Sequence, residues 1–290
     1  MNTETRKILV GVDGSDASIE ALKWAATLAE HLGITVTAAV AWRNILKVDH
    51  SAGGTPARPP DDIEHQLDEL LHEAADSAGV ENIEYLKLRG PAADALEEAS
   101  RRPDVALLVV GTRGLGPIAG LMLGSVSRKL LFSVTRPLVV VPQVQGPMEV
   151  DHVVVGLDGS PVSEAVAAWT ATLCSGLGAA ATVVRCIDPG AEHSVERLDE
   201  MMTVSHLSFD KDHCAVFRGL GVSYEPVVTN GDPRICLIET ARKNGAGLII
   251  VGQHGSGQFA GLGGTASYLV RHSPLPLAII PMASDLKASA

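Results

Sequence analysis

Residues 8–15 read Ile-Leu-Val-Gly-Val-Asp-Gly-Ser, and residues 153–160 repeat them as Val-Val-Val-Gly-Leu-Asp-Gly-Ser, at an offset of 145. A second stretch, Leu-Leu-Val-Val-Gly at 107–111, returns as Leu-Ile-Ile-Val-Gly at 248–252, at an offset of 141. Solenoid repeats recur every 20 to 50 residues or so, and the spacing here is far longer. The chain therefore contains a duplicated domain, and a site in one half predicts a counterpart in the other.

The length and composition fit two soluble α/β domains. A chain of 290 residues is long enough for two cores, and we place the domains at 1–144 and 150–290, with a linker near 143–150. The formal charge of −11 argues against a nucleic-acid surface, which needs clustered Lys and Arg. It is compatible with one phosphorylated small molecule held by backbone amides.

Targeting signals and cysteine usage predict a cytoplasmic protein. No apolar run approaches the roughly 20 residues that span a bilayer, and the N-terminus lacks the apolar segment of a signal peptide. All four cysteines lie in the second half, without a Cys-x-x-Cys pair. Disulfides that shaped a duplicated fold would occur in both copies, so we expect the thiols to be reduced.

Short apolar runs alternate with helical patterns in both halves, which predicts an open α/β sheet twice. The strands are expected at 7–12, 34–42, 83–88, 105–111, 137–142, 152–157, 181–187, 224–229, 247–252 and 277–281. The helices of the first half are expected at 17–32, 62–79, 91–102 and 124–134. The first helix of the second half is expected to open with Ser160 as its cap and Pro161 in its first turn.

Two segments of each half follow strands at the sheet edge where such folds bind ligands. In the first half they are Gly-Val-Asp-Gly-Ser at 11–15 and Gly-Thr-Arg-Gly at 111–114, the latter followed, after nine intervening residues, by Gly-Ser-Val-Ser at 124–127. The glycines let the backbone approach a ligand, and free N–H groups at the helix start suit a phosphate, to which Arg113 and Arg128 can add charge. Asp13 suits a ribose hydroxyl, an adenine amine or a phosphate-bound Mg²⁺. Tight turns alone would explain the glycines, but the duplication of the whole pattern favours a site.

The pattern Gly-x-Asp-Gly-Ser, followed by Gly-x2-Gly-x9-Gly-Ser, resembles the universal stress protein family in its tandem form, over about 5–142 and 152–281. The resemblance implies two Rossmann-like domains of the adenine nucleotide alpha hydrolase-like class. Each would be an open five-stranded parallel sheet with helices on both faces, and the two would pair as in a dimer. It also implies ATP binding and a role in stress response or growth control. In it, Asp13 and the end of the second strand face the nucleoside, while Gly111, Gly114, Gly124 and Ser125 hold the phosphates.

The ATP contacts expected in the first half are Gly11, Asp13, Gly14, Ser15, Val40, Ala41, Gly111, Arg113, Gly114, Gly124, Ser125, Val126 and Ser127. Those expected in the second half are Gly156, Asp158, Gly159, Ser160, Cys186, Ile187, Gly252, His254, Gly255, Gly264, Thr265, Ala266 and Ser267. Asp13 and Asp158 are also the candidate ligands of an ATP-bound Mg²⁺.

The second copy departs from the first in its phosphate loop. Its spacing reads as Gly-x2-Gly-x8-Gly-Thr, one residue shorter, with His254 in place of Arg113 and Tyr268 in place of Arg128. The hydroxyls of Thr265 and Ser267 remain available to phosphate. We therefore predict that both halves bind ATP and that the first binds it more tightly.

The remaining sequence patterns give weaker evidence about function. No Walker motif is present, and the glycines after residue 111 miss the dinucleotide spacing, so an NAD site is not expected. The His- and acid-rich stretches at 61–72 and 206–214 are interpreted as solvated faces rather than metal sites. The Gly- and Pro-rich segment 43–61 is expected to be disordered rather than a lid.

Three functions follow, of which a nucleotide-dependent regulator is preferred. No nucleophile–base set can be assembled near the glycine loops, so any hydrolysis of ATP is expected to be slow. A slow ATPase or phosphotransferase is the first alternative. A protein-interaction module with vestigial sites is the second. Two domains in one chain can satisfy the pairing that single-domain relatives make between chains, and a homodimer or an unidentified regulatory protein partner is compatible with each function.

Overall fold

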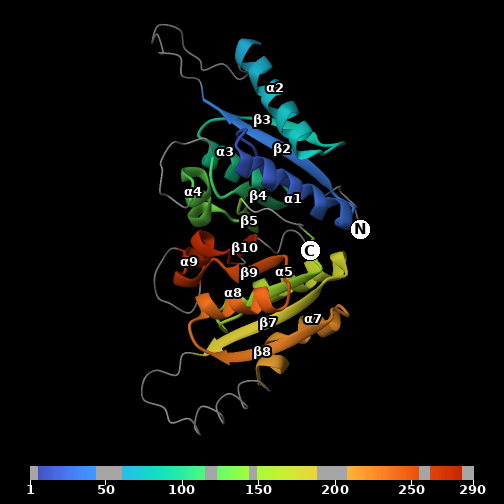
Figure 1. Cartoon of the computed structure of the whole chain (residues 1–290), viewed down its shortest axis with the longest axis vertical. Helices are drawn as coiled ribbons and strands as arrows, with labels where there is room; N and C mark the ends of the chain where they lie inside the picture. The colour runs from blue at the N-terminus through green and yellow to red at the C-terminus, as the bar shows by residue number, and fades with distance from the viewer. Residues whose placement is uncertain are drawn as a thin grey trace.

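The computed structural model describes residues 6–43, 61–114, 123–143, 149–187, 208–254 and 262–282, which form one ten-stranded sheet covered by helices (Figure 1). Most of the predicted disordered segment 43–61, the centre of the linker and the predicted contact Gly255 lie outside the described residues. Among the described residues, no helix is both long and apolar enough to cross a membrane.

The first half follows the predicted alternation of strands and helices. Its elements are β1 (Lys7–Gly11), α1 (Asp16–Leu32), β2 (Thr35–Trp42), α2 (Asp61–Ala78), β3 (Glu84–Arg89), α3 (Ala92–Ser100), β4 (Val105–Gly111), α4 (Ser125–Ser133) and β5 (Leu138–Val141). The strands are all parallel, in the order β3-β2-β1-β4-β5.

The second half repeats this order. Its elements are β6 (His152–Gly156), α5 (Ser163–Leu177), β7 (Ala180–Ile187), α7 (Ala215–Gly219), β8 (Tyr224–Asn230), α8 (Pro233–Lys243), β9 (Leu248–Gly252), α9 (Gly264–His272) and β10 (Leu277–Ile280). Its strands are also parallel, in the order β8-β7-β6-β9-β10. The predicted α/β class, with a five-stranded parallel sheet in each half, is confirmed.

The two sheets are joined edge to edge into one. Strands β5 and β10 pair antiparallel, with Val139 opposite Ala278 and both side chains fully buried. This pairing satisfies two apolar strand edges that would otherwise be open to other chains. A buried glutamine adds to it, because the Nε2 group of Gln253 donates to the carbonyl oxygen of Leu131 at 2.8 Å. The expected dimer-like pairing is therefore made within one chain, and the strand order is symmetric about this junction (Figure 1).

Each face of the joined sheet carries one continuous apolar core. One core lies under α1, α2, α5 and α7 and includes Val10 and Val155 from the two halves. The other lies under α3, α4, α8 and α9 and includes Leu9 and Val154. Neighbouring strand residues thus point to opposite faces, as expected for a parallel sheet covered on both sides.

One predicted helix start is wrong. Helix α5 begins at Ser163, and its cap position is Val162, which makes no side-chain cap bond. Ser160, Pro161 and Val162 instead form a turn, in which the N–H of Ser163 donates to the carbonyl oxygen of Ser160. The other expected helices and strands are found within two residues of the expected ends.

Replacing Gln253 with alanine should destabilise the joined sheet. The change leaves the carbonyl of Leu131 without its buried donor, which costs about 1–3 kcal/mol. Urea unfolding should show this loss. The matched control is Gln143→Ala, whose exposed amide only makes a 3.5 Å bond to Asp16, and we expect a change within about 0.5 kcal/mol. Equal stability of the two variants would contradict a role for Gln253 at the junction.

Candidate functional site

The loop after β1 holds Asp13 in one orientation. The Asp13 Oδ1 atom accepts hydrogen bonds from the backbone N–H and the Oγ of Ser15, at 3.1 and 2.6 Å. Gly14 between them has a φ of +81°, which a side chain would strain. Ser15 in turn caps α1, because its Oγ accepts from the N–H of Ser18 at 3.3 Å. The other oxygen of Asp13 faces Gly114, where any side-chain carbon would collide with it.

The loop after β4 meets the loop after β1 at the same edge of the sheet. Ser15 Oγ donates to the carbonyl oxygen of Arg113 at 3.3 Å, so the two loops are bonded to one another. The N–H of Gly124 donates to the carbonyl oxygen of Thr112, which brings the start of α4 back to the loop. The buried Ser127 hydroxyl donates to the carbonyl oxygen of Gly111 at 2.7 Å. The structure therefore brings together the predicted aspartate and glycine loops.

The start of α4 has the chemistry of an anion site. Gly124 occupies the cap position without a side-chain cap bond, and the first turn has no acidic residue. Ser125 is exposed at the first helical position. The side chains of Arg113 and Arg128 are exposed, and neither makes an ion pair or a hydrogen bond within the described part of the chain. A helix N-terminus and two unpaired cations attract an anionic group.

The end of β2 lies beside the loop after β1. The N–H of Val12 donates to the carbonyl oxygen of Ala39 at 2.8 Å, which continues the pairing of β1 with β2. Val40 is buried in the core, whereas Ala41 is half-buried. A ligand at this end of the site can therefore reach Ala41 more readily than Val40.

The second half repeats the aspartate loop with different bonding. Asp158 Oδ1 accepts from the N–H of Ser160 at 2.9 Å and from Ser163 Oγ at 3.1 Å. Gly159 takes the same left-handed conformation as Gly14, with a φ of +77°. The Oγ of Ser160, however, is buried without a hydrogen-bond partner, whereas Ser15 uses its hydroxyl in three bonds. The repeated sequence thus forms a similar loop, but without the hydrogen bonds that the Ser15 hydroxyl makes in the first half.

The expected alignment of the second phosphate loop is wrong by one residue. The N–H of Gly263 donates to the carbonyl oxygen of Gln253, as that of Gly124 donates to Thr112, and Gly263 caps α9 as Gly124 caps α4. The loop is therefore two residues shorter than in the first half, rather than one. The counterpart of Gly124 is Gly263, which is not among the predicted ATP contacts.

This shift changes what the second loop offers to a phosphate. Gly264, Thr265, Ala266 and Ser267 take the places of Ser125, Val126, Ser127 and Arg128. The exposed hydroxyl at the helix start, the buried hydroxyl and the arginine are all lost together. Ser267, rather than Tyr268, stands in the place of Arg128. Gly252 and His254 remain the counterparts of Gly111 and Arg113.

The expected nucleoside contacts of the second half are also displaced by one residue. Gly11 pairs with Ala39, and Gly156 pairs with Val184, so Arg185 and Cys186 match Val40 and Ala41. Ile187 is therefore not the counterpart of Ala41. The Arg185 guanidinium lies 6.0 Å from the centre of the Phe209 ring. A constant offset of 145 between the first two strands of each half would have identified Arg185 from the sequence.

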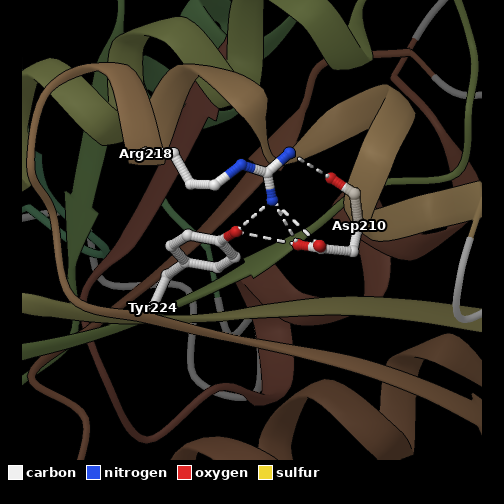
Figure 2. Close-up of polar contacts among 3 residues, drawn as sticks. All are labelled: Asp210, Arg218 and Tyr224. Carbon is white, nitrogen blue, oxygen red and sulfur yellow. Dashed lines mark hydrogen bonds and ion pairs between the residues drawn. The ribbon is translucent and has the colours of Figure 1, made fainter.

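The polar cluster at 206–214 has a structural role in the residues described. Asp210 accepts two bonds of 2.9 Å from one guanidinium nitrogen of Arg218, and one of 2.8 Å from the hydroxyl of Tyr224 (Figure 2). Burial, and then the bond to Asp210, raise the pKa of Tyr224. The three side chains hold α7 and the preceding helical turn against β8. Cys214 is fully buried, which corrects its expected place on a solvated face.

The second acidic stretch, on α2, lies partly against the sheet. Lys87 of β3 makes an ion pair with Asp68 at 2.6 Å, and His65 faces Glu69 at 3.2 Å. Within the ranges that the structure describes, no three His, Cys, Asp or Glu side chains are grouped to hold a metal ion.

The fold and these loops define a tandem α/β protein with a glycine loop and an aspartate at the same sheet edge in each half. The chain belongs to the universal stress protein family, whose model matches residues 4–142 and 149–281. Universal stress protein Rv1996 of Mycobacterium tuberculosis is 30% identical over 96% of this chain and 96% of that protein. A universal stress protein of Mycolicibacterium smegmatis is 27% identical over 94% and 96%.

Solved structures share the tandem fold. A universal stress protein from Archaeoglobus fulgidus is similar, with a TM-score of 0.68 and 18% identity, over 97% of this chain and all of that one. A functionally unknown protein, PA1789, from Pseudomonas aeruginosa has a TM-score of 0.64 and 16% identity, over 98% and 95%. At these identities the likeness concerns the fold alone.

Ser127→Ala should test the buried bond that closes the first loop. The change removes the 2.7 Å bond to Gly111 and should lower the free energy of unfolding by about 1–2 kcal/mol. Alanine fits sterically, since Ala266 occupies the same place in the second half. Thermal unfolding would measure the loss, with the exposed Ser133→Ala as the control that changes little. A loss no larger than the control's would show that the bond does not stabilise the loop.

Proposed function

We propose that this protein is an ATP-binding regulator with one strong and one weak nucleotide site. The observation that carries the proposal is that the side chains of Arg113 and Arg128, beside an uncapped helix start, make no ion pair or hydrogen bond with the residues that the structure describes. A single surface arginine without a partner does not indicate a binding site. Two of them on either side of a glycine loop suit the phosphates of a nucleotide. Because the chain has a net charge of −11, two arginines at one edge of the sheet are a local exception to its acidic composition.

In this proposal Asp13 binds the nucleoside side of ATP or the Mg²⁺ that ATP carries. Its bonds to Ser15 fix one oxygen, which leaves the carboxylate oriented before a ligand arrives. Preorganisation of this kind lowers the cost of binding. The remaining contacts are the backbone at Val40 and Ala41 and the glycines of the two loops. We assign residues 1–144 and 150–290 to the strong and weak domains.

The second half is the weaker site because its loop lacks the exposed hydroxyl and the arginine of the first. The positions of Ser125, Ser127 and Arg128 hold Gly264, Ala266 and Ser267. A hydrogen bond to a charged group contributes about 1.5–3 kcal/mol, so losing one or two such bonds lowers affinity by at least about tenfold. Asp158, the backbone amides and the hydroxyls of Thr265 and Ser267 remain and would still hold a nucleotide weakly.

A regulator needs two states that ATP binds differently. The joined sheet fixes the two halves to one another, so we place the ATP-dependent change in the loops at the sheet edge. A protein partner in the cytoplasm, or a second copy of the chain, would recognise the loops of the occupied state. Mass spectrometry of small molecules released from the purified protein would show which nucleotide it carries.

Titration of two aspartate variants with ATP and Mg²⁺ should reveal the asymmetry. In calorimetry, Asp13→Glu should remove most of the heat of binding, because the longer side chain collides with the Gly114 backbone region. Asp158→Glu should leave the tighter phase intact. Asp151→Glu, an exposed aspartate outside the loops, is the matched control. Equal losses from Asp13→Glu and Asp158→Glu would refute unequal sites, and no binding by the unaltered protein would refute the proposed function.

A further inference from the structure

Two alanines at the nucleoside end of the first half are replaced by two cysteines in the second. Ala41 is the last but one residue of β2, opposite Leu88, and Cys186 is the last but one residue of β7, opposite Thr229, at the matching position of the strand pair. Ala95 in α3 is the counterpart of Cys236 in α8, because the next residues, Leu96 and Leu237, make the same contact with Gly11 and Gly156. The two exchanges therefore concern one location in the fold.

The two cysteines are neighbours in space. The Sγ atom of Cys236 lies 3.9 Å from the carbonyl oxygen of Asn230 and beside Gly231, directly after the end of β8. Cys186 lies on β7, next to that end of β8. Burial raises the pKa of the Cys186 thiol to about 12, with a further contribution from the adjacent thiol of Cys236. In the first half the same space is lined by two methyl groups.

Cys186 and Cys236 are also more exposed to solvent than the other two cysteines. Cys174 and Cys214 are fully buried. Cys186 and Cys236 are partly exposed at the edge where the strands end. All four thiols are free in the structure. An oxidant in solution can thus reach one pair of neighbouring thiols.

We propose that Cys186 and Cys236 form a reversible disulfide that controls nucleotide binding in the second half. A small-molecule disulfide such as oxidised glutathione is the oxidant. The Cys236 thiolate attacks one of its sulfurs, forming a mixed disulfide and releasing one glutathione thiolate. The Cys186 thiol then loses its proton to solvent and attacks the Cys236 sulfur as a thiolate, which releases the second glutathione as a thiolate that takes up a proton. The protein loses two electrons and two protons, and the oxidant becomes two glutathione thiols.

The bond would act where the nucleoside is proposed to bind. It ties the end of β7 to the first turn of α8, and the sulfurs must approach to about 2.05 Å. This draws the two elements together at Cys186, whose backbone is the counterpart of the nucleoside contact at Ala41. We expect oxidation to weaken ATP binding in the second half alone, since the first half has no cysteine. This consequence rests on the proposed function; the disulfide does not.

Peptide mapping of the full-length protein decides whether the bond forms. After treatment with oxidised glutathione and alkylation of the free thiols, we expect Cys186 and Cys236 in one cross-linked peptide pair and both buried cysteines alkylated once the protein is denatured. In Cys186→Ala, a glutathione adduct should remain on Cys236. Alkylation of both Cys186 and Cys236 after oxidation, or bonds only between chains, would overturn the proposal. The variant Cys186→Ala/Cys236→Ala, which restores the alanines of the first half, is the matched control.

Calorimetry distinguishes the proposed control of ATP binding by the disulfide from the proposed nucleotide site itself. In an Asp13→Glu background, oxidation should lower the ATP affinity of the second half by about tenfold, and reduction should restore it. Oxidation should not change the affinity of the double alanine variant in the same background. An unchanged affinity with the disulfide formed would overturn the control of binding. No ATP binding by the reduced protein would instead refute the proposed second nucleotide site, while the peptide map still decides the disulfide.

Discussion

Strands β5 and β10 pair along edges that each half, taken alone, would leave open. Their side chains are fully buried, and they connect two apolar cores that run through the whole chain on either face of the sheet. The Gln253 bond to Leu131 adds a polar contact to a seam that is otherwise apolar. Because the halves share one sheet, their two site edges are held in a fixed relation, and neither domain can move without disturbing both cores.

The duplication also separates what is required for folding from what is specific to each site. Both halves retain the aspartate, the left-handed glycine after it and the glycine that caps the last helix. They differ in the side chains around those constant features. Among the described residues, the first half has Ser127 bonded to the strand end and two arginine side chains without a partner. The second half has a Ser160 hydroxyl without a partner in the same residues, and a cysteine pair. In the function we propose, the first half binds ATP strongly and the second half responds to oxidation.

The strand and helix pattern was predictable because it depends on local composition. Runs such as Leu-Leu-Val-Val-Gly predict buried parallel strands, and the ends were found within two residues except at α5. That start was missed because Ser160 and Pro161 are typical of a helix cap, whereas in the fold they make a preceding turn. The loop alignment failed for a related reason. Several glycines between 257 and 264 allow more than one match, and the bond of Gly263 to Gln253, with the place of Gly263 as the cap of α9, identifies the true one.

The sequence by itself determined the α/β class, the duplication, the two glycine loops and their aspartates, because each depends on residues close together in the chain. The tertiary structure alone decided how the halves join, since pairing between β5 and β10 depends on edges about 140 residues apart. It also decided which residues share a site. Cys186 and Cys236 are 50 residues apart in the chain and become neighbours only when β7, β8 and α8 pack together.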